Sequence, residues 1–288
     1  MVVKETEKKR EVRLLALDVD GTLFDSNGHV TEKTIQALKS AREKGVQVVL
    51  ASGRGYDWMP WDQLTEVEMD YVITTNGGGV YRCGDGMCLH EETMDGKELL
   101  PLFQFLQEKE VYITVFMDGA TYTPRQCFSY VENMDVPEYV AQSLKDGKKE
   151  LKDLEEYIRT HEAKIQKVTL NFQKAPDGGY LNREKVKEYL EALTDIHAVD
   201  GGFANLEFTK AGVSKATGIR FLSEMLQIPM EQTMAAGDSE NDIEMICEAG
   251  IGIAMGNALE QVKQAADGIT ETNDEAGVAC AVEKYILI

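Results

Sequence analysis

The stretch LLALDVDGTLFDS, residues 14–26, joins a buried strand to two carboxylates at its end. The apolar run Val12–Leu17 is followed at once by a turn signal, a pattern typical of a strand buried on both faces of a parallel sheet. Asp18 and Asp20 are poor strand formers, and two like charges so close repel each other unless a positive group lies near them. The sequence therefore predicts that partners from elsewhere in the chain meet these two aspartates.

The composition limits the kinds of partner that the chain can have. Its 288 residues suffice for two domains or for one domain with a large insertion. A formal net charge of -20 argues against nucleic acid and anionic membranes as partners, because both would be repelled. The 5 cysteines form no CxxC pair, which predicts reduced thiols and a cytoplasmic protein. No feature of the sequence predicts an oligomeric state.

Further apolar runs repeat the pattern of the first strand. Residues 31–45 predict a helix, with Thr31 as its N-cap and Gly45 just past its end. Strand patterns follow in residues 46–51 and 71–78, and the same texture returns after residue 207. The later part predicts helix, strand and helix in residues 213–229, 233–238 and 239–250. Strands and helices alternating in this way predict a doubly wound parallel sheet with right-handed crossovers.

The middle of the chain has a different pattern of apolar and polar residues. Stretches such as KVTLNFQ alternate apolar and polar residues, which predicts strands of an antiparallel sheet with one open face. We therefore expect a core made of residues 1–84 and 208–288, interrupted by an inserted α/β unit at residues 85–207.

Four polar clusters fall at the predicted carboxyl ends of core strands or at the start of a core helix. Ligands of open α/β sheets bind at this edge. The clusters are Asp18 with Asp20, Ser52-Gly53-Arg54, Lys215, and Asp238 with Asn241 and Asp242. A DxD pair alone also fits a glycosyltransferase metal motif or a polar turn. Four clusters in this order on these elements favour a single active site.

These clusters resemble, in order, the four motifs of the haloacid dehalogenase superfamily. The matching segments are DVDGT, ASGR, the lysine of GVSKATGI, and GDSENDIEM. The large insertion and the phrase TTNGG are similar to the Cof-type hydrolases, whose α/β cap of the C2 type lies at this place. The resemblance implies a Rossmann-like core and a Mg²⁺-dependent phosphatase. Its substrates would be small phosphorylated metabolites: sugar phosphates, nucleotides or cofactor phosphates.

The resemblance and elementary chemistry assign the same roles to the acidic residues. Asp18 would attack phosphorus and form an aspartyl-phosphate, and Asp20 would move protons to the leaving oxygen and from the attacking water. A Mg²⁺ ion would be held by Asp18, Asp238 and the backbone carbonyl of Asp20, since hard oxygen ligands suit it. The ion would let an anionic nucleophile approach an anionic phosphate.

The remaining motif residues are expected to hold the phosphate. Ser52 and the amide of Gly53 would donate hydrogen bonds to phosphate oxygens, and Lys215 would add a positive charge. Asn241 could reach phosphate or a metal-bound water. Asp242 is expected to orient the metal site or Lys215.

Three features near these motifs stay outside the expected catalytic set. Arg54 could hold its loop or meet the substrate. Asn76 is expected to be a turn residue near the hinge of the inserted unit, and Gly77–Gly79 a flexible turn without the spacing of a dinucleotide loop.

Two other functions remain open from the sequence. A phosphomutase would use the same core chemistry, but the inserted unit offers few arginines for a second phosphate. A non-catalytic phosphometabolite sensor would not need Asp20 as an acid and base.

Overall fold

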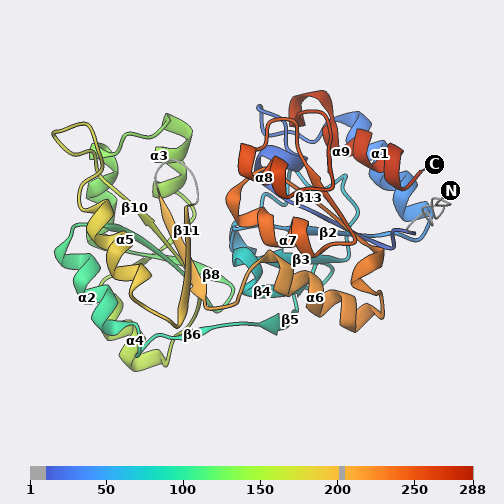
Figure 1. The fold of residues 1–288 in the computed structure, drawn as a ribbon. Coiled ribbons are helices and arrows are strands. Elements are labelled where there is room, and N and C mark those ends of the chain that lie inside the picture. Colours follow the sequence, from blue (N-terminus) through green and yellow to red (C-terminus); the bar gives the residue numbers. More distant parts are fainter. Residues whose placement is uncertain (1–10, 201–204, 288) are drawn as a thin grey trace, which may run out of the picture.

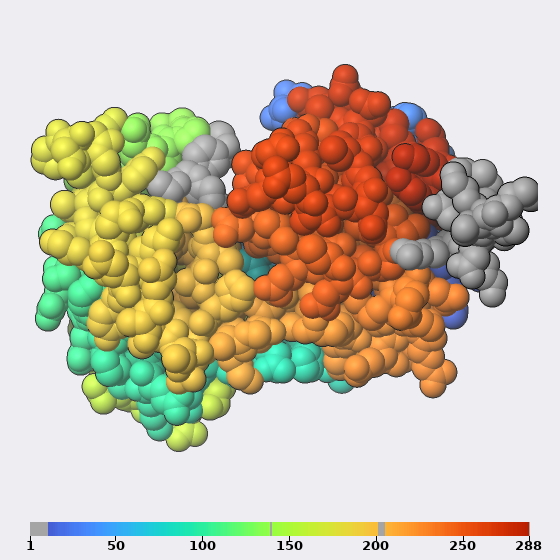
Figure 2. Space-filling view, in the orientation of Figure 1, coloured from blue at the N-terminus to red at the C-terminus, as the bar shows by residue number. Residues whose placement is uncertain are grey.

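The chain forms two α/β units, seen in a computed structural model that describes residues 11–200 and 205–287 (Figure 1). The unit that carries both chain ends holds a largely parallel sheet, and the inserted unit holds a largely antiparallel one. Figure 2 shows the two units as two lobes. The predicted fold class, a doubly wound core with an inserted α/β cap, is confirmed.

The first sheet has 8 strands, with β1 in its interior. In spatial order the strands are β15 (Gly268–Ile269), β14 (Ile251–Ala254), β13 (Thr233–Gly237), β1 (Leu14–Leu17), β2 (Gln47–Ala51), β3 (Tyr71–Thr74), β4 (Gly79–Arg82) and β5 (Cys88–Glu91). Pairing is parallel from β15 to β3 and antiparallel at β4 and β5. Because β13 and β2 flank β1 in parallel, the carboxyl ends of these three strands meet at one edge.

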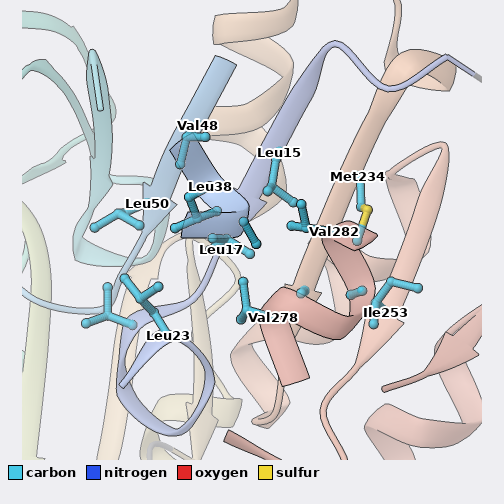
Figure 3. Close-up of a cluster of buried hydrophobic side chains, with 14 of the residues drawn as sticks. Leu15, Leu17, Leu23, Leu38, Val48, Leu50, Met234, Ile253, Val278 and Val282 are labelled. Atoms are coloured by element: carbon cyan, nitrogen blue, oxygen red, sulfur yellow. The ribbon is translucent and has the colours of Figure 1, made fainter. Parts of the chain in front are cut away.

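Helices cover both faces of this sheet, which explains the unbroken apolar run of β1. Leu15 and Leu17 pack into one apolar cluster, shown in Figure 3, while Leu14 and Ala16 pack into another on the opposite face. The helices of this unit are α1 (Glu32–Glu43), α6 (Lys215–Leu226), α7 (Ile243–Glu248), α8 (Glu260–Ala265) and α9 (Gly277–Tyr285). The side chain of Thr31 accepts the Thr34 amide and caps α1 as predicted.

The second sheet has 7 strands and lies wholly in the inserted unit. Its spatial order is β11 (Ile196–Asp200), β12 (Leu206–Lys210), β10 (Lys164–Asn171), β7 (Tyr112–Met117), β8 (Ala120–Pro124) and β9 (Lys149–Leu151), with β6 (Met94–Asp95) paired to β10. All its pairs are antiparallel except β8 with β9.

One face of the second sheet is apolar and the other is polar. The helices α2 (Leu100–Glu108), α3 (Glu138–Lys145), α4 (Leu154–His161) and α5 (Arg183–Glu191) belong to this unit. Val168 and Leu170 belong to the apolar cluster, which includes residues of α2, α4 and α5. Lys167 and Thr169 alternate with these residues along β10 and are also buried. The alternation of apolar and polar residues in the sequence had predicted that this face of the sheet would be open to solvent. Among the described residues, no helix combines the length and apolar character needed to cross a membrane.

The chain crosses twice between the two units, after β5 and after β12. Strand β5 pairs with β4, which places residues 88–91 in the first sheet, whereas residues 206–210 belong to the second. Lys210 Nζ lies 2.7 Å from Glu92 Oε2 and ties the two crossings together. On this strand pairing we propose dividing the units near residues 92 and 211, rather than at 84 and 207. Residues 1–10 and 201–204 of the expected division lie outside the described residues.

Candidate active site

The end of β1 brings Asp18 against a fully buried lysine. Lys215 Nζ lies 2.5 Å from Asp18 Oδ1 and 2.7 Å from Asp242 Oδ1. All three side chains are buried, so the ammonium donates to both carboxylates away from water. Lys215 is thus a positive partner of the kind that the two aspartates required.

Packing against the TTNGG segment positions Lys215 at the start of α6. A Cβ at Gly77 would lie 1.9 Å from the carbonyl oxygen of Ser214, and Gly77 has a φ of +99°. Only glycine fits both the contact and this backbone conformation. The turn expected at Gly77–Gly79 is present, with Gly77 ending a 3-10 turn and Gly79 beginning β4, and all three glycines are buried.

The loop after β13 places Asp238 beside the turn that carries Asp20. Thr22 Oγ1 donates to Asp238 Oδ1 at 2.8 Å, and Ser239 Oγ donates to Oδ2 at 3.1 Å. A Cβ at Gly21 would lie 2.6 Å from Asp238 Oδ2, so the absence of a side chain lets the two loops meet. The loops after β1 and β13 thus form one contiguous surface.

Asp242 stabilises this arrangement through hydrogen bonds. Its Oδ2 accepts the amides of Asp238 at 3.0 Å and Ser239 at 2.9 Å, while Oδ1 accepts Lys215. Both oxygens of Asp242 are therefore occupied by donors of the chain itself. These contacts place Asp242 between Lys215 and the loop of Asp238, and its orienting role stays a prediction.

Burial shifts the titration of the acidic residues. Burial raises the pKa of Asp18 well above its usual range; Lys215 opposes this, and Asp242, Asp238 and Asp20 add to it. Burial and then Asp242 raise the pKa of Asp238 to about 6. Burial by itself would lower the pKa of Lys215, but Asp18 and Asp242 outweigh it and raise the value. The site therefore gathers more negative charge than Lys215 compensates.

The donor set fits a hard divalent cation. Asp18, Asp238 and Asp242 each offer an oxygen, and these oxygens all lie within 4.8 Å of one another. Because Asp242 already accepts three donors, Asp18 and Asp238 are the carboxylates with capacity for an ion. Carboxylate oxygens at such a separation suit Mg²⁺.

Asp20 is held by an arginine whose role the sequence left open. Arg54 Nε and Nη2 each lie 2.8 Å from one oxygen of Asp20, a bidentate pair. Burial would lower the pKa of Arg54, and the hydrogen bond to Asp20 raises it. The Asp20 side chain keeps 56% of its surface exposed, so it stands at the mouth of the site.

The loop after β2 lies between the two units. The hydroxyl of the buried Ser52 accepts the Arg54 amide at 3.1 Å, which leaves its own proton free to donate. A Cβ at Gly53 would lie 2.9 Å from Asn76 Oδ1 and 3.1 Å from Lys167 Nζ. Gly53 is therefore flanked by a residue of the first unit and one of the second.

A chain of hydrogen bonds runs from Asn241 to the second unit. Asn241 Nδ2 donates to Asn76 Oδ1 at 3.1 Å, and Asn76 Nδ2 donates to Glu207 Oε2 at 2.8 Å. Asn241 Oδ1 is buried and has no partner in the described part of the chain. Asn76 is thus more than the turn residue we expected, because it bridges the two units.

The backbone at this bridge is unusual. Thr75 and Asn76 have φ values of 52° and 56°, in the left-handed region. A β-branched residue such as Thr75 rarely adopts this conformation. Such strain clusters at functional sites. The sequence signal for Asn76 was its place directly before three glycines. Lys167 and Glu207, which lie in an alternating strand pattern, carried none.

A small cleft, partly open to solvent, lies between the units. Asn76, Asn241 and Ser214 line it from the first unit, and Glu207 and His197 line it from the second. The buried hydroxyl of Ser214 has no partner among residues 11–200 and 205–287. The cleft therefore adjoins the proposed phosphate site through Asn76.

Comparison with known proteins gives a consistent result along nearly the whole chain. The model of a family described as haloacid dehalogenase-like hydrolases matches residues 15–282. Phosphatase YwpJ of Bacillus subtilis is 32% identical over 282 residues, which cover 93% of this chain and 98% of that protein. The 5-amino-6-(5-phospho-D-ribitylamino)uracil phosphatase YcsE of the same organism is 30% identical, with 96% and 97% covered.

Solved structures share the arrangement of both units. A haloacid dehalogenase-like hydrolase from B. subtilis has a TM-score of 0.80 at 29% identity, covering 94% of this chain and 99% of that one. The subclass IIB sugar phosphatase BT4131 has a TM-score of 0.78 at 25% identity, with 95% and 99% covered.

Proposed function

The chain belongs to the haloacid dehalogenase-like hydrolases, as a Cof-type member and a phosphoric monoester hydrolase, and we propose that it hydrolyses small phosphorylated metabolites with Mg²⁺ through an aspartyl-phosphate. The resemblance of the four sequence motifs to this superfamily is confirmed. The observation that carries the proposal is the position of Lys215 between Asp18 and Asp242, at the strand edge shared with Asp238.

In the first step Asp18 attacks phosphorus. Lys215 contacts Oδ1, so we assign the attack to Oδ2. A bond forms between this oxygen and phosphorus as the bond to the ester oxygen breaks, and the electron pair leaves with that oxygen. The leaving oxygen takes a proton from Asp20 and departs as an alcohol.

In the second step Asp20 takes a proton from water. The water oxygen bonds to phosphorus, the bond to Asp18 breaks, and inorganic phosphate is released with the carboxylate restored. The bidentate pair with Arg54 holds Asp20 in place before substrate enters.

The phosphate group would be held by donors of the first unit. Ser52 Oγ has a free proton, the Gly53 amide lies next to it, and Lys215 supplies positive charge. Asn241 supplies an amide close to the same loop through Asn76.

Asp18, Asp238 and the backbone carbonyl of Asp20 would hold the Mg²⁺ ion. When bound, it supplies the positive charge that offsets the excess of buried carboxylates and the charge of the phosphate. Support comes from the donor set within 4.8 Å and from the raised pKa of Asp18 and Asp238.

The proposed substrate class rests on the substrates for which relatives are named. YcsE is named for a phosphorylated ribitylamino compound and BT4131 for sugar phosphates, so polyol and sugar phosphates lead the list of substrates to test, followed by nucleotides and cofactor phosphates. We further propose that the protein works in the cytoplasm, in keeping with its 5 free cysteines.

Phosphate release from a panel of phosphomonoesters, with Mg²⁺ and with EDTA, tests this proposal. Asp18→Asn should lower kcat by at least about 10³-fold, and acid-quenched wild-type protein should carry a phosphoryl group detectable by mass spectrometry. Asp25→Asn is the matched control, because Asp25 lies in the same stretch and its carboxylate accepts the local Asn27 and His29 amides.

Three results would contradict the proposal. They are undiminished hydrolysis in Asp18→Asn, activity without any divalent ion, and isomerisation of a hexose 1-phosphate without phosphate release. The last result would establish the phosphomutase alternative.

A further inference from the structure

A lysine of the inserted unit reaches the loop that is proposed to bind phosphate. Lys167 lies on β10, and its Nζ is 3.1 Å from the position that a Cβ at Gly53 would occupy. Only 2% of this residue is exposed. Its ammonium lies 2.8 Å from Glu207 Oε2 and 5.1 Å from the centre of the Phe116 ring. A charged group is thus buried at the boundary between the units, within reach of the site.

An irregularity in β10 directs Lys167 toward the first unit. Ile165 pairs with Met117 and Lys167 with Phe116, so Gln166 is an extra residue on the β10 side. Such bulges re-aim side chains and occur often next to active sites. Gln166 Nε2 donates to Tyr81 Oη at 3.1 Å, so both bulge residues contact the first unit.

The strand register places Lys167 on a polar but buried face. Residues two apart on a strand and residues paired across strands share a face, so Thr169 and Asn171 lie on the same side as Lys167. Asn171 Oδ1 is buried and lacks a partner in the described part of the chain. This face therefore carries a polar group that the described residues do not satisfy.

The ammonium of Lys167 also has donors to spare. An ammonium group has three N–H donors, and Glu207 is the acceptor that the described residues provide. Glu207 also accepts Asn76 and, at 3.3 Å, Thr169. Burial lowers the pKa of Lys167, Glu207 raises it and Lys215 lowers it again, which shows that the two lysines lie close enough to interact.

We propose that Lys167 is a specificity-determining residue, which donates a hydrogen bond to an oxygen of the leaving group beside the ester oxygen. This inference rests on the proposed function. An in-line attack by Asp18 requires the leaving group to point away from that residue. The phosphate donors come from the first unit, whereas Lys167 approaches the same loop from the second unit, and we place the leaving group on that side.

A matched pair of substrates tests the proposal. Glycerol 3-phosphate and propyl phosphate share a three-carbon chain and differ in their hydroxyl groups. The wild type should prefer glycerol 3-phosphate, by about tenfold or more in kcat/KM, because the buried ammonium gains an acceptor. In Lys167→Met this preference ratio should fall at least about fivefold.

Control variants separate substrate contact from structural damage. Lys164→Met makes the same change on the same strand, at an exposed lysine that pairs with Asp95 at 2.8 Å, and should leave the ratio unchanged. Lys167→Gln keeps a donor for Glu207 but loses the charge, so it remains usable if the methionine variant does not fold. Its ratio should fall in the same direction.

A binding measurement keeps this test independent of turnover. In an Asp18→Asn background, calorimetry with Mg²⁺ should give tighter binding of glycerol 3-phosphate than of propyl phosphate, and adding Lys167→Met should remove the difference. Failure of wild-type hydrolysis would overturn the proposed function, whereas binding would still decide the role of Lys167. A wild type without preference, or an equal loss for both compounds in the Lys167 variants, overturns the inference.

Discussion

At the scale of single residues, the site is dominated by buried carboxylates. Asp18 and Asp242 share Lys215, whereas the side-chain donors that the described residues give to Asp238 are the hydroxyls of Thr22 and Ser239. Because a hydroxyl offsets a buried charge poorly, the folded protein holds a proton on Asp238 more tightly than the unfolded chain does. Stability, pH and metal binding are therefore linked at this residue.

The first prediction concerns this linkage. The pKa of Asp238 is about 6 in the folded protein against 3.8 for the free residue. Between these values the folded state binds more protons, so without metal the free energy of unfolding should fall as pH rises, by up to about 3 kcal/mol. In EDTA, Asp238→Asn should thus be more stable than the wild type at pH 7.5, and the difference should vanish near pH 4.

Adding Mg²⁺ should reduce this difference by about half. At tenfold above its Kd the ion should stabilise the wild type by about 1.4 kcal/mol at pH 7.5, and by less at pH 5, where protons compete for the same oxygens. Urea unfolding of both proteins across this pH range, with EDTA and with Mg²⁺, measures the effect. Equal stability of the two proteins at every pH would refute it.

At the scale of elements, the site depends on how closely the β3–β4 turn approaches α6. The missing side chain of Gly77 admits the carbonyl of Ser214, the residue before Lys215. A change of one ångström here displaces the helix start, and with it the ammonium between Asp18 and Asp242.

The second prediction follows from this contact. Gly77→Ala places a methyl group 1.9 Å from a backbone oxygen at a φ of +99°, so it should lower the free energy of unfolding by more than about 3 kcal/mol and reduce kcat/KM at least about tenfold. Gly84→Ala is the control, because no atom lies within 4 Å of its Cβ position. Chemical denaturation and phosphate release measure both effects. A Gly77→Ala protein as stable as the control would disprove the packing argument.

The elements that could be predicted from the sequence are those with local signals. Strand β1, the N-cap at Thr31 and the loops carrying Asp18, Ser52 and Asp238 were predicted because their signals are local: apolar runs, capping residues and polar residues at strand ends. The close packing of Gly77 could not be predicted, because it depends on Ser214, far along the chain.

The same distinction between local motifs and tertiary packing applies to the residues of the site. Asp18, Asp20, Lys215 and Asp238 stand in short motifs, so their meeting could be predicted. The pairs Arg54 with Asp20 and Lys167 with Glu207 form only through tertiary packing. A buried lysine within an alternating strand looks in sequence like any exposed one.

At the scale of the whole molecule, the loop after β2 makes one of the contacts between the two units. Asp57, just after β2, accepts both the amide and the hydroxyl of Thr121 on β8, each at 2.9 Å. A Cβ at Gly55 would lie 2.9 Å from Phe116, so the same loop is pressed against the second sheet. This loop also leads directly from Ser52 and Gly53.

The third prediction tests whether this contact holds the units together. Asp57→Ala removes two hydrogen bonds worth about 1 kcal/mol each, so an arrangement with the units apart should become more populated. KM should rise about threefold to tenfold, and the radius of gyration from small-angle scattering should increase. Asp62→Ala, an exposed aspartate of the same loop, should change neither. An unchanged KM and radius in Asp57→Ala would show that other contacts suffice.

The order of strands in the first sheet has a consequence for synthesis of the protein. The neighbours of β1 are β2, made soon after it, and β13, made only after the whole inserted unit. At ribosomal speeds of ~5–20 residues per second, one apolar edge of β1 stays unpaired for on the order of ten seconds or more. The inserted unit meanwhile has all its strands and can fold first. The nascent chain is thus most vulnerable to aggregation at Leu14–Leu17, the same strand that later ends in the nucleophile.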